Sequence, residues 1–167
     1  MDIFETMRQR RSSRKFTQAP VSQEDLLTIA QAARLTATSS NQQSRRFTIV
    51  HKQATIQKFE KALASYGYGL YAPQALLLIS SPRHNTYSQI ETGLAVQNAY
   101  LAATALGLAT VWTDQIRNRC DEVAIRKLLT EIKIPTDHIC WTILPIGVPA
   151  ENPASKERRE EMIYIAD

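Results

Sequence analysis

The chain has 167 residues, of which 44% are hydrophobic and 22% are charged, and its formal net charge is +4. This size and balance are typical of one soluble globular domain, so we expect residues 1–167 to form a single domain. Much of the basic excess lies in two short segments, 8–15 and 156–159. A nucleic-acid-binding surface is usually basic over a whole face, so two separate clusters fit a small anion better.

Cysteine content and hydropathy restrict the class of protein further. The chain has only two cysteines, Cys120 and Cys140, with no CxxC spacing. A disulfide framework and a zinc site are therefore not expected, and both thiols are predicted to be buried and reduced. No apolar run approaches the 18 residues of a transmembrane helix, and no signal peptide is visible. We therefore expect a cytoplasmic protein.

Capping residues and apolar spacing predict three helices in the first half of the chain. Asp2 and Glu5 form a capping-box-like start for a first helix. Ser22 and Asp25 begin a second helix, and residues 54–65 carry the apolar spacing of a third. Between the second and third helices, a polar loop is expected, followed by a strand.

Two apolar segments in the middle of the chain predict buried elements. Residues 75–79, bounded by two prolines, read as a buried strand. Residues 87–106 give the longest helical pattern, and from residue 94 onward it is almost wholly apolar or small. Such a helix is buried either centrally or in a subunit interface. Gly107 is expected to end it.

The last third of the chain predicts strands around one further helix. The predicted segments are a strand at 109–113, a helix at 118–130, a β-rich run at 139–148 and a last strand at 162–165. The whole pattern is that of an α+β protein, with a mixed sheet flanked by helices.

The segment from Arg10 to Arg14 is the strongest candidate for a binding site. Its three guanidinium groups flank two hydroxyl groups, a combination that fits a phosphate monoester. A solvated basic turn explains the same residues equally simply. Lys156 and Arg158 alternate near the other end of the chain and would form a second phosphate clamp if that segment is extended. The alternative there is an ordinary charged tail.

A second candidate is the polar loop at 36–45, where six of ten residues are Thr, Ser or Asn. It is either a surface connection or a ring of hydrogen-bonding groups for a polar ligand, with Asn41 able to donate and accept. Nucleophile, nucleotide-loop and metalloprotease motifs are absent from the sequence, and its three histidines stand in unrelated contexts. Chemistry supplied by a cofactor is consistent with this scarcity.

A series of short motifs follows the chain in a fixed order. They are Arg10 to Arg14, the Ser/Thr-rich loop ending Asn41-Gln42-Gln43, Ala72-Pro73, Gln97-Asn98, Leu106-Gly107-Leu108 with Trp112, Gly147 to Glu151, and Lys156-Glu157-Arg158. Taken together and in this order, the motifs resemble the nitroreductase family of FMN-dependent oxidoreductases, from residue 3 to about residue 160.

The resemblance implies a mixed, mainly antiparallel sheet and an intertwined homodimer, with residues 94–106 in its central helix. It implies FMN as the cofactor, and NAD(P)H and a small oxidant, such as a nitro compound or quinone, as substrates in a ping-pong reaction. It implies no separate catalytic residue. A metal site, a nucleic-acid partner and a membrane partner are not expected from the residues themselves. The residues it assigns to FMN are Arg10, Arg11, Ser12, Arg14, Lys156 and Arg158 near the phosphate and ribityl chain, Thr38, Ser39 and Asn41 from the partner subunit's loop, and Trp112, Thr113 and Asp114 near the ring.

The sequence departs from the family pattern mainly in the polar loop. Ala37 replaces the usual proline near its start, and Ser44-Arg45 replaces the usual Pro-Trp. The loss of an aromatic residue and the extra cation at Arg45 are expected to change either the conformation of the loop or the acceptor that is tolerated. The stretch after residue 59, where family lids are often inserted, is also short. A flavin-binding carrier or redox sensor without robust turnover is therefore the alternative function.

Overall fold

A four-stranded antiparallel sheet lies at the centre of the computed structural model, which describes residues 2–154, 157–159 and 163–166. The strand order is β1-β2-β4-β3. The strands are β1 (Arg46–Val50), β2 (Ala75–Pro82), β3 (Ala109–Thr110) and β4 (His138–Gly147). All three pairings between neighbouring strands are antiparallel, as expected for the mainly antiparallel sheet.

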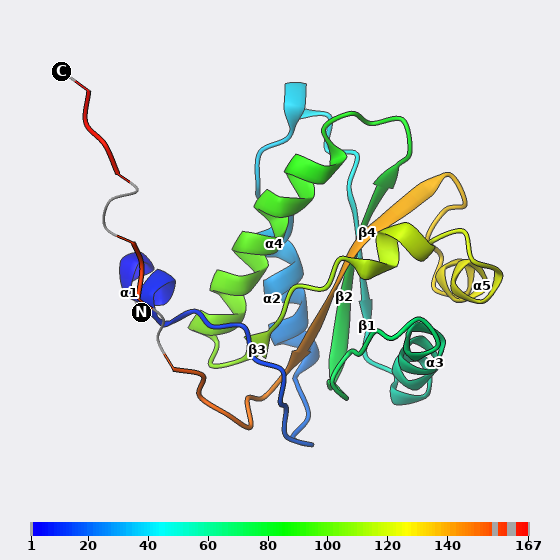
Figure 1. Cartoon of the computed structure of the whole chain (residues 1–167), viewed down its shortest axis with the longest axis horizontal. Helices are drawn as coiled ribbons and strands as arrows, with labels where there is room; N and C mark the ends of the chain where they lie inside the picture. Colours follow the sequence, from blue (N-terminus) through cyan, green and yellow to red (C-terminus); the bar gives the residue numbers. More distant parts are fainter. Residues whose placement is uncertain (1, 155–156, 160–162, 167) are drawn as a thin grey trace.

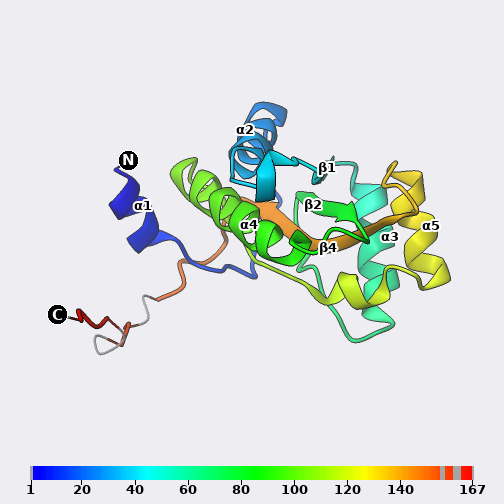
Figure 2. The same cartoon turned by 90° about the horizontal axis from the view of Figure 1, so that it is seen from above.

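Helices cover both faces of this sheet, which gives a three-layer arrangement (Figure 2). The helices are α1 (Ile3–Gln9), α2 (Gln23–Arg34), α3 (Gln53–Ala64), α4 (Ser88–Ala105) and α5 (Val123–Glu131). One face carries α2 and α4, and the other carries α3 and α5 (Figure 2). The short helix α1 lies away from the sheet and contacts α4 (Figure 1).

Strand β2 shows why the sheet is covered on both sides. Its first seven residues are all buried. Because side chains alternate along a strand, Leu76 and Leu78 pack into the core under α3 and α5. Leu77 and Ile79 pack into the other core, under α2 and α4. A continuous apolar run is what a strand buried on both faces requires.

Helix α4 has one face on the sheet and another that this chain leaves open. Ala95, Ala99 and Ala103 are fully buried at spacings of four residues. On the other side, Ile90 is 67% exposed and Leu94 is 47% exposed. Central burial within one chain, one of the two alternatives for residues 94–106, therefore does not hold for Leu94, and the subunit-interface alternative stays a prediction. Gly107, at φ +72°, follows the helix end as predicted.

Three other predicted elements differ from the structure. The strand expected at 109–113 stops at Thr110 and pairs again only at Thr113, which forms a bridge with Ile143, because the register places Val111 opposite Pro145, which has no N–H to donate. The helix expected at 118–130 begins only at Val123, because residues 115–119 form a separate 3-10 helix and Glu122, with ψ 130°, has an extended backbone. Residues 163–165 are exposed and form no strand, and residue 162 lies outside the described part.

The other predicted helices and strands are confirmed within one to three residues at their ends. Ser22 caps α2 as expected, since its hydroxyl accepts a hydrogen bond from the Asp25 N–H at 3.0 Å. Asp2 occupies the N-cap position of α1 but makes no such side-chain bond. Among the residues that the structure describes, no helix combines the length and hydropathy needed to span a membrane.

Candidate functional site

After α1 ends, residues 10–17 run in an extended conformation along the open edge of the sheet. Ser12 forms a parallel bridge with Thr110 of β3, and Thr17 N–H donates to the Val148 carbonyl at 2.9 Å. Ala150 N–H in turn donates to the Lys15 carbonyl at 3.0 Å. The last two bonds hold residues 15–17 against residues 148–150, so an early segment of the chain lies beside a late one.

The extended conformation determines which side chains of this segment face outward. Ser13 is buried, with only 1% of its surface exposed, because it points into the protein. Its neighbours Ser12 and Arg14 therefore point the other way, since side chains alternate along an extended segment. Both of these side chains line a cavity at the surface.

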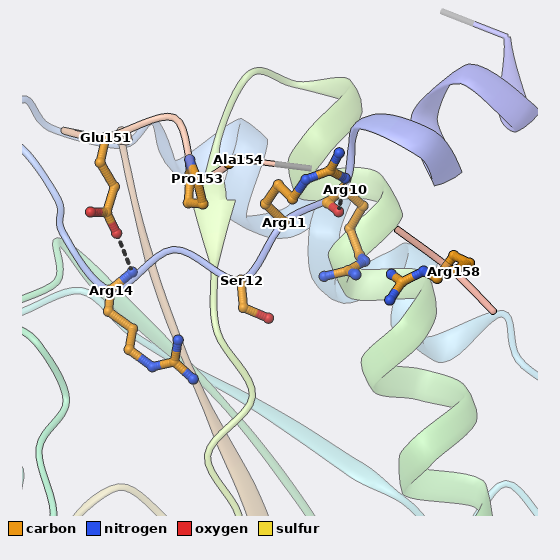
Figure 3. A pocket seen from close by; sticks show the side chains of 8 residues that line it. All are labelled: Arg10, Arg11, Ser12, Arg14, Glu151, Pro153, Ala154 and Arg158. Carbon is orange, nitrogen blue, oxygen red and sulfur yellow. Dashed lines mark hydrogen bonds between the residues drawn. The ribbon is translucent and has the colours of Figure 1, made fainter. Parts of the chain in front are cut away.

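This cavity, which we call the arginine cavity, has a volume of about 360 Å³ and draws on both ends of the chain (Figure 3). It is lined by Arg10, Arg11, Ser12, Arg14, Glu151, Pro153, Ala154 and Arg158. In Figure 3 the guanidinium groups of Arg10 and Arg158 face the same space, and Arg14 lies on the other side of Ser12. Lys156, the other predicted member of the second clamp, lies outside the described residues.

Positive charge dominates the arginine cavity. Four arginines and one carboxylate, Glu151, are among its lining residues. Glu151 accepts a hydrogen bond from the Arg14 N–H at 3.3 Å and lies 3.4 Å from the Lys15 ammonium group. Arginine charges that face one another repel, so an anion between them is strongly favoured. The cavity is therefore suited to a small, multiply charged anion.

Arg11 contributes differently from the other arginines. Its Nη1 donates to the carbonyl oxygens of Arg8 at 2.5 Å and Arg10 at 2.8 Å, at the end of α1. Its Nε is buried and has no hydrogen-bond partner among the described residues. Part of this guanidinium therefore holds the last turn of α1 in place, and Nε remains available as a donor.

Tyr100 of α4 connects the arginine cavity with the segment after β3. Its hydroxyl lies 3.1 Å from the Ser12 hydroxyl and accepts a hydrogen bond from the Trp112 N–H at 2.6 Å. The guanidinium of Arg10 lies over the Tyr100 ring, 5.1 Å from its centre. Sequence reasoning missed Tyr100, although it is the one phenol in the otherwise small and aliphatic part of this helix.

Trp112 and Asp114 line a second cavity of about 170 Å³, between the start of α4 and the segment after β3. Its lining residues are Gln89, Thr92, Gly93, Val96, Trp112, Asp114, Arg117 and Trp141. Asp114 lies 3.6 Å from Arg117, which balances its charge. The buried hydroxyl of Thr92 has no partner among the described residues. This cavity is more apolar than the first.

Trp141 of β4 lines the second cavity, and Thr113 lies on the segment that pairs with β4 beside it. Thr113 donates from its N–H and its hydroxyl to the Ile143 carbonyl, at 3.3 and 2.7 Å, so both of its donors are used within the protein. A register shift between Ile79 and Ser80 leaves Trp141 without a partner residue on β2. Trp141 was not predicted as a site residue, and a bulge of this kind has no clear sequence signal.

The predicted loop residues Thr38, Ser39 and Asn41 do not line either cavity of this chain. Their loop lies against the first turn of α4, where the Ser39 N–H donates to Glu91 Oε1 at 2.8 Å. Three non-glycine residues here adopt a left-handed backbone: Ser40 (φ 50°), Asn41 (φ 55°) and Gln43 (φ 49°). Such conformations are costly and persist only where the surroundings impose them.

Arg45 is the residue that anchors this loop. It is only 8% exposed, and it donates to the hydroxyl and carbonyl of Thr36 and to the carbonyl of Glu91, at 2.6–2.8 Å. Burial lowers the pKa of its guanidinium, and the Glu91 carboxylate opposes that shift. The hydrogen-bonding groups of Arg45 point into the protein and fix the conformation of the loop, and its influence on the choice of substrate acceptor stays a prediction.

Comparison with known proteins shows which family this chain belongs to. The model of the nitroreductase family matches residues 7–67 and 64–148. The chain belongs to the nitroreductase family. A relative from Methanothermobacter thermautotrophicus, named as an NADH dehydrogenase/NAD(P)H nitroreductase, is 28% identical, with 94% of this chain and 82% of that protein covered. The NADPH-flavin oxidoreductase of Vibrio harveyi is 27% identical, with 98% of this chain and 72% of that protein covered.

The fold of this nitroreductase family member also matches a solved structure. The Bacteroides fragilis nitroreductase with bound FMN has a TM-score of 0.90 and 24% sequence identity, and each chain is covered completely. The α+β fold inferred from the sequence is thus confirmed.

Glu151 lines the arginine cavity, although the sequence analysis does not assign it to the site. It is the last residue of the Gly147–Glu151 motif of the family resemblance.

Proposed function

We propose that this chain binds FMN and acts as an NAD(P)H-dependent oxidoreductase on a nitro compound, quinone or similar acceptor. The observation that carries the proposal is the arginine cavity, in which Arg10, Arg14 and Arg158 from opposite ends of the chain line one space. Bound FMN supplies the hydride transfer between NAD(P)H and the acceptor, in two successive half-reactions. The protein supplies binding, orientation and a favourable charge.

The residues present fit the phosphate group of FMN. A phosphate monoester carries up to two negative charges and three acceptor oxygens, and the arginines offer planar donors that pair with such oxygens. The unpartnered Nε of Arg11 and the hydroxyl of Ser12 add donors at the same place. The expected contribution of Lys156 is part of the proposal, since this residue lies outside the described part of the chain.

The flat ring of FMN is expected beyond the phosphate, near Trp112, Thr113 and Asp114. Support comes from the second cavity, which is lined by two tryptophans and lies beside the same segment. The Tyr100 hydroxyl bonds to both Ser12 and Trp112, so the two cavities share a neighbour.

A second copy of this chain is expected to complete the site. Thr38, Ser39 and Asn41 lie at the other end of α4 from Ser12, so within one chain they are held away from the arginine cavity. The exposed Ile90 and Leu94 on the same helix supply an apolar surface for a partner. A homodimer would thus bring the loop of one subunit to the cofactor of the other.

The proposal is tested with purified protein, titrated with FMN and, separately, with riboflavin. FMN should bind more tightly, because riboflavin lacks the phosphate that the arginines hold. NADH or NADPH should then bleach the flavin absorption, and a nitroaromatic compound or quinone should restore it over many turnovers. Failure to bind FMN would overturn the proposal. Binding and bleaching with a single slow reoxidation would instead support the carrier or sensor alternative.

A further inference from the structure

We propose that Tyr100 is a positioning residue that turns the Ser12 hydroxyl into a hydrogen-bond donor aimed at the anion in the arginine cavity. The proposal rests on the proposed function, because that anion is taken to be the phosphate of FMN. It concerns a residue of α4 whose ring is buried and whose hydroxyl lies between two parts of the site.

The direction of the hydrogen bonds follows from the chemistry of the three groups. A backbone N–H can only donate, so the bond from Trp112 N–H to Tyr100 Oη, at 2.6 Å, has a fixed direction. The Tyr100 hydroxyl keeps one hydrogen of its own. The Ser12 hydroxyl, at 3.1 Å, is its only other partner among the described residues.

Donation from Tyr100 to Ser12 is therefore the arrangement in which no buried donor is left unpaired. Tyr100 is only 6% exposed, so an unpaired hydroxyl hydrogen there would be costly. Once Ser12 Oγ accepts this bond, the hydrogen of Ser12 is free to point elsewhere. Ser12 lines the arginine cavity, and an anion there is the natural acceptor.

The ring of Tyr100 has a separate role that a phenylalanine would keep. Arg10 lies over the ring face, 5.1 Å from its centre, in a cation–π arrangement. Replacing Tyr100 by phenylalanine removes the hydroxyl but retains the ring beneath Arg10. The variant Tyr100→Phe therefore isolates the hydrogen-bond relay from the packing of the arginine.

The experiment is a double-mutant cycle on FMN affinity with wild type, Tyr100→Phe, Ser12→Ala and the double variant. Tyr100→Phe should weaken FMN binding by about two- to tenfold, the range for one hydrogen bond. The double variant should bind no more weakly than Ser12→Ala alone, because Tyr100 acts through Ser12. Riboflavin affinity should be nearly the same in all four proteins.

Tyr87→Phe is the matched control. Tyr87 precedes the same helix, its side chain is 49% exposed, and its hydroxyl makes no hydrogen bond to the described residues. The Tyr87→Phe variant should bind FMN as tightly as the wild type does.

Two outcomes of the cycle would overturn the relay. One is that the effects of Tyr100→Phe and Ser12→Ala on FMN affinity are additive, and the other is that Tyr100→Phe weakens the binding of FMN and riboflavin equally. A wild-type protein that binds no FMN would instead overturn the proposed function itself.

Discussion

Arg45 and Glu91 hold the polar loop to the first turn of α4 from opposite sides. Arg45 Nη1 donates to the Glu91 carbonyl at 2.8 Å, and the Glu91 carboxylate accepts from the Ser39 N–H at 2.8 Å. Both side chains are buried. Burial of charged groups is costly unless each is paired or hydrogen-bonded, so the two residues depend on each other.

Removal of this arginine should therefore destabilise the fold. We expect Arg45→Met to lower the free energy of unfolding by about 2–4 kcal/mol, because three hydrogen bonds are lost and Glu91 is left without a nearby cation. Urea denaturation measures the change. The neighbouring Arg46→Met is the control, since Arg46 is exposed and should tolerate the change. Equal stability of the two variants would contradict the anchoring role.

Arg14 should contribute to FMN binding through its charge. We expect Arg14→Ala to weaken binding by about 1.5–3 kcal/mol, the range for a hydrogen bond between charged groups. Quenching of flavin fluorescence during a titration gives the dissociation constant. Arg8→Ala serves as control, because Arg8 is exposed, pairs with Glu5 at 3.4 Å and does not line the cavity. The assignment of Arg14 fails if the two variants bind FMN equally well.

His138 should make the stability of the protein depend on pH. Burial lowers its pKa below the ordinary value of 6.5, with smaller contributions from Arg46 and Arg126 in the same direction and from Asp137 against it. As the pH falls, the unfolded chain therefore takes up a proton at His138 before the folded chain does. The stability that the neutral imidazole allows is complete above about pH 6.5 and is lost as the pH falls toward the lowered pKa of the folded protein.

The measurement compares urea midpoints at about pH 8 and about pH 5.5 in wild type and His138→Gln. The variant should lose less stability on acidification than the wild type. His51→Gln is the control, because His51 is exposed. An acid-induced loss that is the same in all three proteins would show that His138 does not contribute to it.

Cys120 and Cys140 should be unreactive in the folded protein. Burial raises the pKa of both thiols, so little thiolate is present at neutral pH. Cys120 Sγ also accepts a hydrogen bond from the Cys140 N–H at 3.2 Å. A thiol reagent such as dithionitrobenzoate should label neither cysteine in native buffer and both in urea. Rapid labelling of the native protein would contradict this burial.

The helices and the long strands could be predicted because their signals are local. Ser22 and Asp25 specify the start of α2, and the apolar run at 75–79 specifies a buried strand. The meeting of Arg10–Arg14 with Arg158 was a hypothesis that needed the family resemblance, since no local pattern relates segments so far apart. The bridge between Phe16 and Pro149, together with the bond from the Ala150 N–H to the Lys15 carbonyl, provides its physical basis.

The parts that could not be predicted depend on tertiary contacts. Arg45 looks like a surface cation in the sequence, and only the packing of its loop on α4 shows that it is buried. The gap in the strand after Thr110 depends on the register with β4, which places Val111 opposite Pro145 before pairing resumes at Thr113. A proline on the partner strand removes one ladder hydrogen bond, whatever the local strand preference.

The order of the segments along the chain has a consequence for biosynthesis. The arginine cavity needs residues 10–14 and Arg158, and β4, a central strand of the sheet, is the last strand in chain order among the described residues. While the ribosome is still adding these residues, β2 has no partner on one side and the cavity lacks one wall. Cofactor loading is therefore expected only once β4 and residue 158 have been made, and a nascent chain arrested before β4 should not retain FMN.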